Sequence, residues 1–361
     1  MKIGIDISQV IYGTGVSVYT KNLVENLLKI DDKNSYLLFG GSLRRKDDLK
    51  KFTNGLKGNY KEKISFLSPK LADFLWNRLH IIKIESFIGK VDVFHSSNWT
   101  QPPSNAFKVT TVHDLAPIRY PQLMDESLIS NTKIGMKWIK KEVDKIIVPS
   151  NATRKDLELL GIPARKVVVI PEAADPFYKA VSKFEVDKIK NKYNLSNYIL
   201  GVGVGERKNS NRLIEAYKLV KDKLNVQLVF VGQAPSNFTK EKDVIFLGHV
   251  SNFDLRNLYG GAYCLAYPSL YEGFGLPILQ AFACSSPVLT SNISSMPEVA
   301  GDAAVLVDPF NVESISEGLL KVGKMSEALV KKGLQQVKKY SWETTAKMTL
   351  DVYREAKINN G

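Results

Sequence analysis

A chain of 361 residues is long enough for two domains that each enclose a hydrophobic core. Its hydrophobic residues (44%) and charged residues (24%) fall in the range of folded globular proteins, which excludes a disordered chain. The net charge of +13 favours a polyanionic partner, namely a nucleic acid, an anionic membrane surface or a phosphorylated substrate, unless it only solvates the surface.

Short apolar runs alternate with amphipathic segments along the first half of the chain, which predicts βαβ units and a parallel sheet. The predicted strands are 2–7, 36–39, 91–95, 109–112, 145–149 and 167–171, and the predicted helices are 16–28 and 129–142. The alternation pauses in a charged stretch after Pro171 and then resumes. There the predicted strands are 198–204, 227–231, 244–247, 262–267, 288–290 and 304–307, and the predicted helices are 211–220, 255–259 and 276–283. The sequence therefore predicts an α/β protein of two Rossmann-type domains, 1–171 and 172–340, and a final amphipathic helix from Ser341.

Several classes of site and partner are disfavoured by the residues present. The two cysteines lie in apolar contexts, which favours buried thiols in a reducing compartment over disulfides. The four histidines share no spacing with a cysteine and no Asp-x-Asp pair occurs, so we expect no metal cofactor. We find no basic stripe interleaved with aromatic residues, so we expect no nucleic-acid partner. Neither a signal peptide nor a membrane-spanning helix is predicted, which indicates a cytoplasmic protein.

Two loops in the first half hold candidate site residues, because ligands of open α/β sheets bind beyond the carboxyl ends of the strands. Gly13 and Gly15 precede the first predicted helix, and glycines let the backbone approach a phosphate at a helix N-terminus. An ordinary tight turn is the alternative, because the pattern is too short for a dinucleotide fingerprint. His113 and Asp114 follow the strand 109–112 and suit sugar hydroxyls or proton transfer, with an Asp-capped turn beside a packed His as the alternative.

Two loops in the second half carry charged candidates. Arg207 and Lys208 follow the strand 198–204 beside a helix start, where fixed positive charge stabilises a diphosphate; a solvated basic pair is the alternative. Glu272 is a lone carboxylate in apolar surroundings and needs a partner, either a pair of sugar hydroxyls or an arginine or backbone group within the fold. The glycines after it, with Pro277 in the first turn of a helix, offer amides to a diphosphate without a metal.

The order of these loops along the chain resembles the retaining glycosyltransferases of the GT-B architecture, in the large family 4 (group 1) class, and is mannosyltransferase-like. The resemblance covers nearly the whole chain and includes the segments 148–150, 169–171, 213–216, 246–250 and 297–303. It implies a GT-B fold of two Rossmann-like, doubly wound domains that face each other across a cleft. Residues 1–171 then form the acceptor domain, on which a C-terminal helix within 341–361 packs back, and residues 172–340 bind the nucleotide sugar.

The resemblance also implies roles for single residues. Lys208 binds the donor diphosphate with the help of Arg207, which also replaces an arginine that many members carry after the preceding strand. Glu272 contacts the donor sugar, and His113 lies near the reacting sugar. These four residues are the catalytic candidates. Gln280 stands where the family has a glutamate that holds the ribose, and an amide binds that hydroxyl less strongly than a carboxylate. The donor-binding candidates are Gly13, Gly15, Asp114, Gly205, Val250, Gly273, Phe274, Gly275, Leu276 and Gln280.

The function implied by the resemblance is the transfer of a hexose from a nucleotide diphosphate sugar to a glycan or lipid-linked acceptor in cell-surface polysaccharide assembly. GDP-mannose is the first donor candidate and a UDP-sugar the second. No facing pair of carboxylates is evident, so we expect retention by attack from the leaving-group face, without a covalent intermediate. The alternatives are an epimerase or hydrolase of the same fold that uses no acceptor, and a non-catalytic sugar-nucleotide-binding module, which Gln280 favours.

The segment 74–83 mixes aromatic and aliphatic residues with basic ones. Together with the positive net charge, it suggests peripheral contact with an anionic membrane that carries a lipid-linked acceptor. A helix packed in the core is the alternative.

Overall fold

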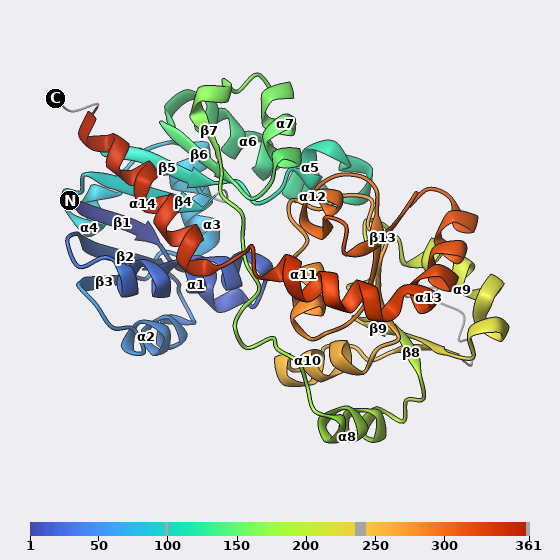
Figure 1. Ribbon diagram of the computed structural model, residues 1–361. Coiled ribbons are helices and arrows are strands. Elements are labelled where there is room, and N and C mark those ends of the chain that lie inside the picture. Colours follow the sequence, from blue (N-terminus) through green and yellow to red (C-terminus); the bar gives the residue numbers. More distant parts are fainter. Residues whose placement is uncertain (98–99, 235–242, 359–361) are drawn as a thin grey trace. The chain divides into compact units, whose positions relative to one another are not determined.

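The computed structural model describes residues 1–97, 100–234 and 243–358. The chain divides into two compact units: unit 1 comprises Met1–Glu172 with the C-terminal segment from Ser341, and unit 2 comprises Ala173–Tyr340. Each unit contains one parallel sheet flanked by helices (Figure 1).

Unit 1 is built on a seven-stranded sheet with the strand order β3-β2-β1-β4-β5-β6-β7. Its strands are β1 (Lys2–Asp6), β2 (Ser35–Gly41), β3 (Tyr60–Ser65), β4 (Val93–Ser97), β5 (Phe107–Thr111), β6 (Lys145–Val148) and β7 (Val167–Val169). Its α-helices are α1 (Gly15–Ile30), α2 (Lys46–Asn54), α3 (Pro69–Ala72), α4 (Glu85–Ile88), α5 (Ala116–Arg119), α6 (Glu126–Glu142), α7 (Asn151–Leu159) and α14 (Trp342–Ile358). It also has three short 3₁₀ helices, η1 (Ser8–Tyr12), η3 (Pro121–Leu123) and η4 (Ala164–Lys166), and a π-helix, η2 (Asp73–Arg78), among the residues described. The strand order reverses between β1 and β4, and ligands of such sheets bind at the carboxyl ends of the strands at this point.

The C-terminal helix α14 packs on α1, so the end of the chain belongs to the unit formed by its beginning (Figure 1). Trp342 is buried at the start of α14, with its ring edge-on to Tyr19 of α1 at 5.8 Å between centroids. Further along α14, the hydroxyl of Tyr353 lies 2.6 Å from Nδ1 of His95 on β4. A buried aromatic residue thus fixes each end of the contact.

Unit 2 is built on a six-stranded sheet with the strand order β10-β9-β8-β11-β12-β13. Its strands are β8 (Tyr198–Val202), β9 (Gln227–Val231), β10 (Val244–Phe246), β11 (Cys264–Tyr267), β12 (Val288–Ser291) and β13 (Ala304–Val307). Its helices are α8 (Lys183–Tyr193), α9 (Ser210–Leu224), α10 (Asn252–Gly261), α11 (Leu276–Ala283), α12 (Met296–Ala300) and α13 (Val312–Val337). Here the order reverses between β8 and β11, which places the loops after these two strands side by side.

The predicted α/β class is confirmed by the two doubly wound sheets, and each strand predicted from the sequence overlaps an observed one. The apolar alternation overlooked the edge strand β3 and several helices, of which α13 is the longest with 26 residues. The charged stretch after Pro171 contains the helix α8, where the sequence pattern indicated only a pause.

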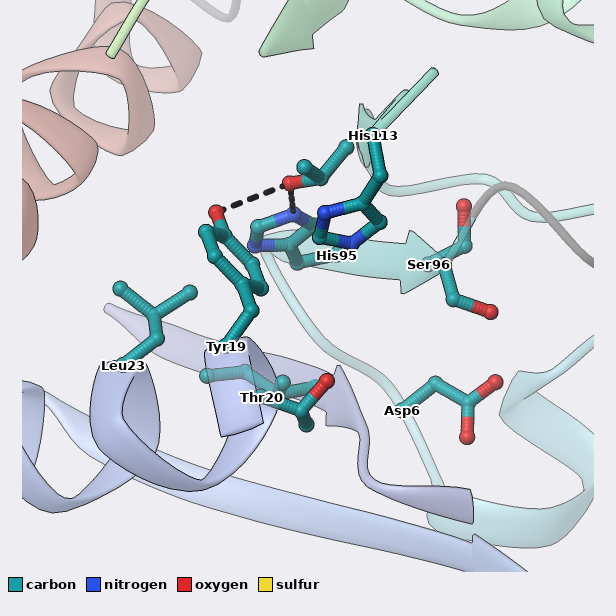
Figure 2. A pocket seen from close by; sticks show the side chains of 10 residues that line it. Asp6, Tyr19, Thr20, Leu23, His95, Ser96 and His113 are labelled. Carbon is teal, nitrogen blue, oxygen red and sulfur yellow. Dashed lines mark hydrogen bonds between the residues drawn. The ribbon is translucent and has the colours of Figure 1, made fainter. Parts of the chain in front are cut away.

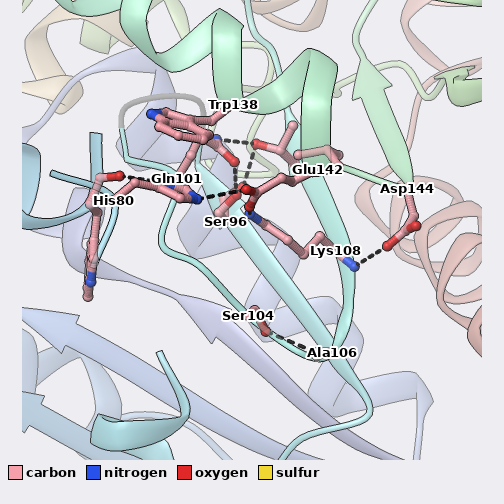
Figure 3. A network of polar contacts seen from close by, with 12 residues as sticks. His80, Ser96, Gln101, Ser104, Ala106, Lys108, Trp138, Glu142 and Asp144 are labelled. Atoms are coloured by element: carbon pink, nitrogen blue, oxygen red, sulfur yellow. Dashed lines mark hydrogen bonds and ion pairs between the residues drawn. The ribbon is translucent and has the colours of Figure 1, made fainter. Parts of the chain in front are cut away.

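The segment 74–83 is packed in the core in part, as the second alternative from the sequence expected. Trp76 is buried in the core of unit 1 and donates its indole N–H to the carbonyl of Ile82 at 3.0 Å. His80 stacks on Trp138 of α6 with ring centroids 3.4 Å apart, and its Nε2 lies 2.9 Å from the carboxylate of Glu142 (Figure 3). Other apolar side chains of the segment are exposed, namely Phe74, Leu79, Ile81 and Ile82.

Candidate functional site

In unit 2, two loops at the reversal of the strand order meet through their backbones. The loop after β8 turns at Gly203 and Gly205, which both have positive φ angles (79° and 131°), and leads into α9. The carbonyl of Arg207 in this loop accepts a hydrogen bond from the backbone N–H of Leu270, in the loop after β11, at 2.9 Å. The amide of Asn209 donates to the carbonyl of Pro268 at 3.0 Å. These bonds hold the predicted cationic loop against the predicted acidic one.

Glu272 lies between two cations. Its Oε2 is 2.8 Å from Nη1 of Arg207, and its Oε1 is 2.7 Å from Nζ of Lys208. Glu272 is only 8% exposed, and burial by itself raises its pKa. The charges and hydrogen bonds of Lys208 and Arg207 outweigh burial and hold the pKa of Glu272 at about 2, so the carboxylate stays ionised. The sequence left open whether an arginine of the fold or a sugar would satisfy Glu272, and Arg207 is such a partner.

Tyr267, at the end of β11, is a further member of this cluster that sequence reasoning missed. Nζ of Lys208 donates to its phenol oxygen at 2.6 Å, and the ammonium lies 4.8 Å from the centre of its ring. Burial raises the pKa of Tyr267 well above its usual range, so it remains a neutral acceptor for the lysine. In the sequence, only its position at a strand end, directly before Pro268, could have indicated that Tyr267 belongs to the site.

The backbone around Glu272 is held by two serines that sequence reasoning also missed. The hydroxyls of Ser294 and Ser295 donate to the carbonyl of Glu272 at 2.7 and 2.9 Å, and that of Ser295 also donates to the carbonyl of Phe274 at 2.6 Å. Gly275 follows with a φ of 117° and caps α11, which has a proline in its first turn. This turn requires glycine, because residues with a Cβ rarely adopt such an angle.

The other donor-binding candidates of unit 2 lie around these loops. Gln280 is on α11, and the buried phenol of Tyr259 donates to its Oε1 at 3.0 Å. This bond occupies the amide oxygen, so the Nε2 group of Gln280 is the part that can donate to a ligand. Val250 and Phe274 are buried in the same core cluster. The remaining positions are Gly205 in the loop after β8, and Gly273, Gly275 and Leu276 after Glu272.

In unit 1, His113 lies just beyond β5 and faces a cavity with Tyr19 and His95 (Figure 2). Its Nδ1 is 3.1 Å from the carboxylate of Glu172, and its ring is edge-on to that of Tyr19 at 4.6 Å. Asp114 caps the turn that begins α5, because its Oδ1 accepts the backbone N–H of Ala116 at 3.0 Å. For Asp114 this contact matches the capping alternative, whereas His113 borders the cavity.

Gly13 and Gly15 flank the start of α1, where Thr14 and Ser17 form a reciprocal capping box. Gly13 has a φ of 68°, and both glycines are exposed. A Cβ built at either position meets no atom of the described chain within 4 Å. The space above this turn is therefore open to a ligand.

Two kinds of feature are absent from the residues that the structure describes. No three His, Cys, Asp or Glu side chains gather in a way that could hold a metal ion. None of the helices has both the length and the apolar content needed to cross a membrane.

Comparison with known proteins identifies related sequences over both units. Residues 13–176 match the model for Glycosyltransferase Family 4, and residues 182–339 match that for Glycosyl transferases group 1. The O-antigen chain mannosyltransferase B of Escherichia coli is 29% identical over 94% of this chain and 96% of its own length. The serotype-specific mannosyltransferase WbdA of Escherichia coli is 28% identical over 71% of this chain, which spans about a third (35%) of that protein.

A solved structure agrees with the fold. HepE of Anabaena, in complex with UDP and glucose, superimposes with a TM-score of 0.73 at 16% identity and covers 98% of this chain and 100% of its own. The two sheets of this protein thus have the GT-B architecture. Because the two family models together match most of the sequence, the chain belongs to the group 1 (family 4) glycosyltransferases and is an enzyme of that kind.

Proposed function

We propose that this glycosyltransferase moves a mannosyl residue from GDP-mannose to a glycan or lipid-linked acceptor during assembly of a cell-surface polysaccharide, with retention at the anomeric carbon. The observation that carries the proposal is the cluster of Arg207, Lys208 and Glu272, with 2.7 and 2.8 Å between opposite charges. The name of the O-antigen chain mannosyltransferase supports the choice of sugar and product class. The HepE complex makes a UDP-sugar the second donor candidate.

The proposed role of the cations is to stabilise the nucleotide diphosphate as it leaves. Arg207 and Lys208 supply fixed positive charge, and the free amides at the start of α11 add to it. This arrangement requires no metal for the charge that develops on the leaving group. The acceptor hydroxyl attacks from the leaving-group face, and the departing phosphate oxygen takes its proton. Glu272 orients the lysine and the arginine and accepts hydrogen bonds from hydroxyls of the donor sugar.

Turnover of GDP-mannose tests this proposal. Lys208→Met is expected to lower kcat roughly 100-fold or more, because fixed charges at a developing anion typically contribute that much. Lys192→Met is the matched control, since Lys192 is an exposed lysine that also pairs with a carboxylate, that of Asp254, in the same unit. Wild-type turnover in Lys208→Met would refute the assignment. Thermal shifts with a panel of nucleotide sugars then identify the donor, because the ligand that binds the folded state stabilises it.

We also propose that the enzyme is cytoplasmic and contacts the inner face of the cell membrane through segment 66–83 of unit 1. Exposed apolar side chains within it are between 44% and 68% accessible, and the ammonium of Lys46 lies 2.9 Å above the ring of Phe66. Basic residues beside exposed apolar ones suit an anionic lipid surface. Vesicles with phosphatidylglycerol are expected to bind the protein at low salt and release it at high salt. Equal binding to neutral vesicles would contradict the electrostatic part of the proposal.

A further inference from the structure

Asn209 links three loops of unit 2 that follow three different strands. It comes directly after Lys208, forms the N-cap of α9 and is 2% exposed. Its Nδ2 group donates one hydrogen bond to the carbonyl of Pro268 at 3.0 Å and another to the carbonyl of Pro309 at 2.6 Å. Pro268 follows β11, and Pro309 follows β13. One side chain thus joins the loop after β8, which carries the cations, to the ends of two other strands.

The side chain of Asn209 does not cap its own helix. Asparagine is a preferred N-cap residue because its side-chain oxygen can accept a hydrogen bond from an N–H in the first turn. Asn209 makes no such capping bond. Its Oδ1 accepts instead from Nη1 of Arg212 at 3.0 Å. The amide therefore serves the neighbouring loops and not the start of α9.

Two requirements at this position favour asparagine over other residues. The backbone is left-handed, with a φ of 60° and a ψ of 32°, a conformation that only glycine, asparagine and aspartate adopt readily. Both partners of Nδ2 are carbonyl oxygens, which accept hydrogen bonds and never donate them. Glycine has no group to donate, and an ionised aspartate would place negative charge against the two carbonyls. Asparagine meets both requirements.

The hydrogen bonds of Asn209 act on the segment that holds both cations. Arg207 and Lys208 precede Asn209 directly, and the carbonyl of Arg207 accepts the backbone N–H of Leu270 at 2.9 Å. The segment is therefore attached to the loop after β11 on both sides of Lys208. The backbone of Lys208 is held in place while its ammonium reaches the carboxylate of Glu272 at 2.7 Å.

The position of this backbone matters for the proposed chemistry. Fixed charges stabilise a developing anion best when they need not rearrange as it forms. Lysine and arginine have long side chains with many rotamers, so the place of the charge depends on the backbone from which the side chain starts. A displacement of about 1 Å in a reacting assembly can lower the rate about 100-fold. A group that holds the backbone of Arg207 and Lys208 therefore affects the rate without touching a substrate.

We propose that Asn209 is a positioning residue of the transfer reaction. Its amide holds the loop after β8 so that Arg207 and Lys208 meet the diphosphate leaving group without rearrangement. The inference rests on the proposed function for the role of the two cations. It adds a residue that acts only through its neighbours in the chain.

Asn209→Gly removes the amide and keeps a residue that adopts the left-handed backbone. In steady-state turnover of GDP-mannose by the full chain, kcat is expected to fall about 10- to 100-fold. The KM for the donor should stay within about twofold, because misplaced cations weaken the transition state more than the bound ground state. Asn225→Gly is the matched control, since the exposed Asn225 has the same left-handed backbone (φ 48°) at the other end of α9. It should leave both constants unchanged.

A double-mutant cycle with Lys208→Met distinguishes positioning from a general loss of structure. If Asn209 acts through Lys208, the factor by which Asn209→Gly lowers kcat should be at least about threefold smaller in Lys208→Met than in the wild type. The part that remains acts through Arg207. A merely structural role would lower kcat by the same factor in both backgrounds, and this result would overturn the proposal.

Arg212→Leu extends the test to a partly exposed side chain, so it applies even if Asn209→Gly does not fold. It removes the partner of Oδ1 and should lower kcat about two- to fivefold at an unchanged KM. Wild-type kcat in both Asn209→Gly and Arg212→Leu, or in Arg212→Leu alone if Asn209→Gly is unfolded, would overturn the positioning role. Wild-type turnover in Lys208→Met would instead refute the proposed function, whatever the other two variants do.

Discussion

Glu272→Gln should remove a specific, pH-dependent part of the stability of unit 2. The glutamine keeps the size of the side chain but not the charge between Arg207 and Lys208. A carboxyl whose pKa falls from 4.5 to about 2 on folding contributes about 3 kcal/mol at neutral pH, since each tenfold change in a protonation equilibrium corresponds to about 1.4 kcal/mol. The folded pKa is lowered, so this contribution is complete above pH 4.5 and is lost as the pH falls towards 2. At pH 3, about 1 kcal/mol of it remains.

Urea unfolding at pH 7 and pH 3 measures this difference. All four tryptophans of the chain lie in the sequence of unit 1, so their fluorescence follows that unit alone. The circular dichroism transition that has no counterpart in tryptophan fluorescence belongs to unit 2. The wild type should exceed Glu272→Gln by about 3 kcal/mol at pH 7 and by about 1 kcal/mol at pH 3 in this transition.

Asp302→Asn provides the control for Glu272→Gln. Asp302 also pairs with a lysine in unit 2, Lys332, but both side chains are largely solvated, so little change is expected. The reasoning would be refuted if the difference between wild type and Glu272→Gln were equal at the two pH values. It would also be refuted if the difference at pH 7 were no larger than that of Asp302→Asn.

Three further variants probe other contacts. Tyr267→Phe removes the oxygen that accepts from Lys208 at 2.6 Å and should lower kcat/KM for the donor roughly tenfold without changing the circular dichroism spectrum; unchanged kinetics would show that the lysine needs no such support. Burial and the charge of His113 lower the pKa of His95 to about 3. The free energy of unfolding of unit 1 should therefore fall by up to about 1.4 kcal/mol for each pH unit below pH 6.5. Tryptophan-monitored unfolding of His95→Gln should lack this slope. A Cβ at Gly318 of α13 would lie 2.5 Å from Cγ1 of Val307, so Gly318→Ala should destabilise unit 2 by about 1–3 kcal/mol; a neutral effect in urea would mean that β13 can yield to the extra methyl group.

The sequence predicted the strands well because the strands of a parallel sheet are buried on both faces and appear as continuous apolar runs. Residues 264–267 and 288–291 are buried throughout. The charged candidates of unit 2 were also predictable, since they follow β8 and β11, and loops at the carboxyl ends of adjacent parallel strands meet. That Arg207 and Lys208 share one carboxylate, however, depends on side-chain directions that spacing alone does not fix.

The helices that sequence reasoning overlooked depend on local signals or on packing. The helix α8 begins with a capping box formed by Ser182 and Glu185, a Ser-x-x-Glu pattern that is visible in the sequence. In α13, Gly318 and Gly333 lower the intrinsic helix propensity, yet both give close approach to side chains of the core. Such a helix is stabilised by its tertiary contacts, and its own composition predicts it poorly.

Contacts between segments far apart in the chain could not be predicted from the sequence. Ser294 and Ser295 donate to the carbonyl of Glu272, more than twenty residues away in the sequence. Nothing in the strand pattern around Tyr267 indicates that its phenol accepts a hydrogen bond from Lys208. The cavity of unit 1 likewise gathers residues from three strands and a helix. Hydrogen-bond partners of this kind become known only when the fold brings the segments together.

The contact between α14 and α1 constrains the order in which the chain folds during synthesis. The hydrogen bond between Tyr353 and His95 joins residues 258 positions apart, and the whole of unit 2 is translated between them. Unit 1 therefore emerges from the ribosome before unit 2 but lacks α14 until residues 342–358 have been made, whereas unit 2 can complete its core earlier. Until then the surface of α1 that receives α14 stays exposed, and exposed apolar surface of this kind favours contact with chaperones and aggregation.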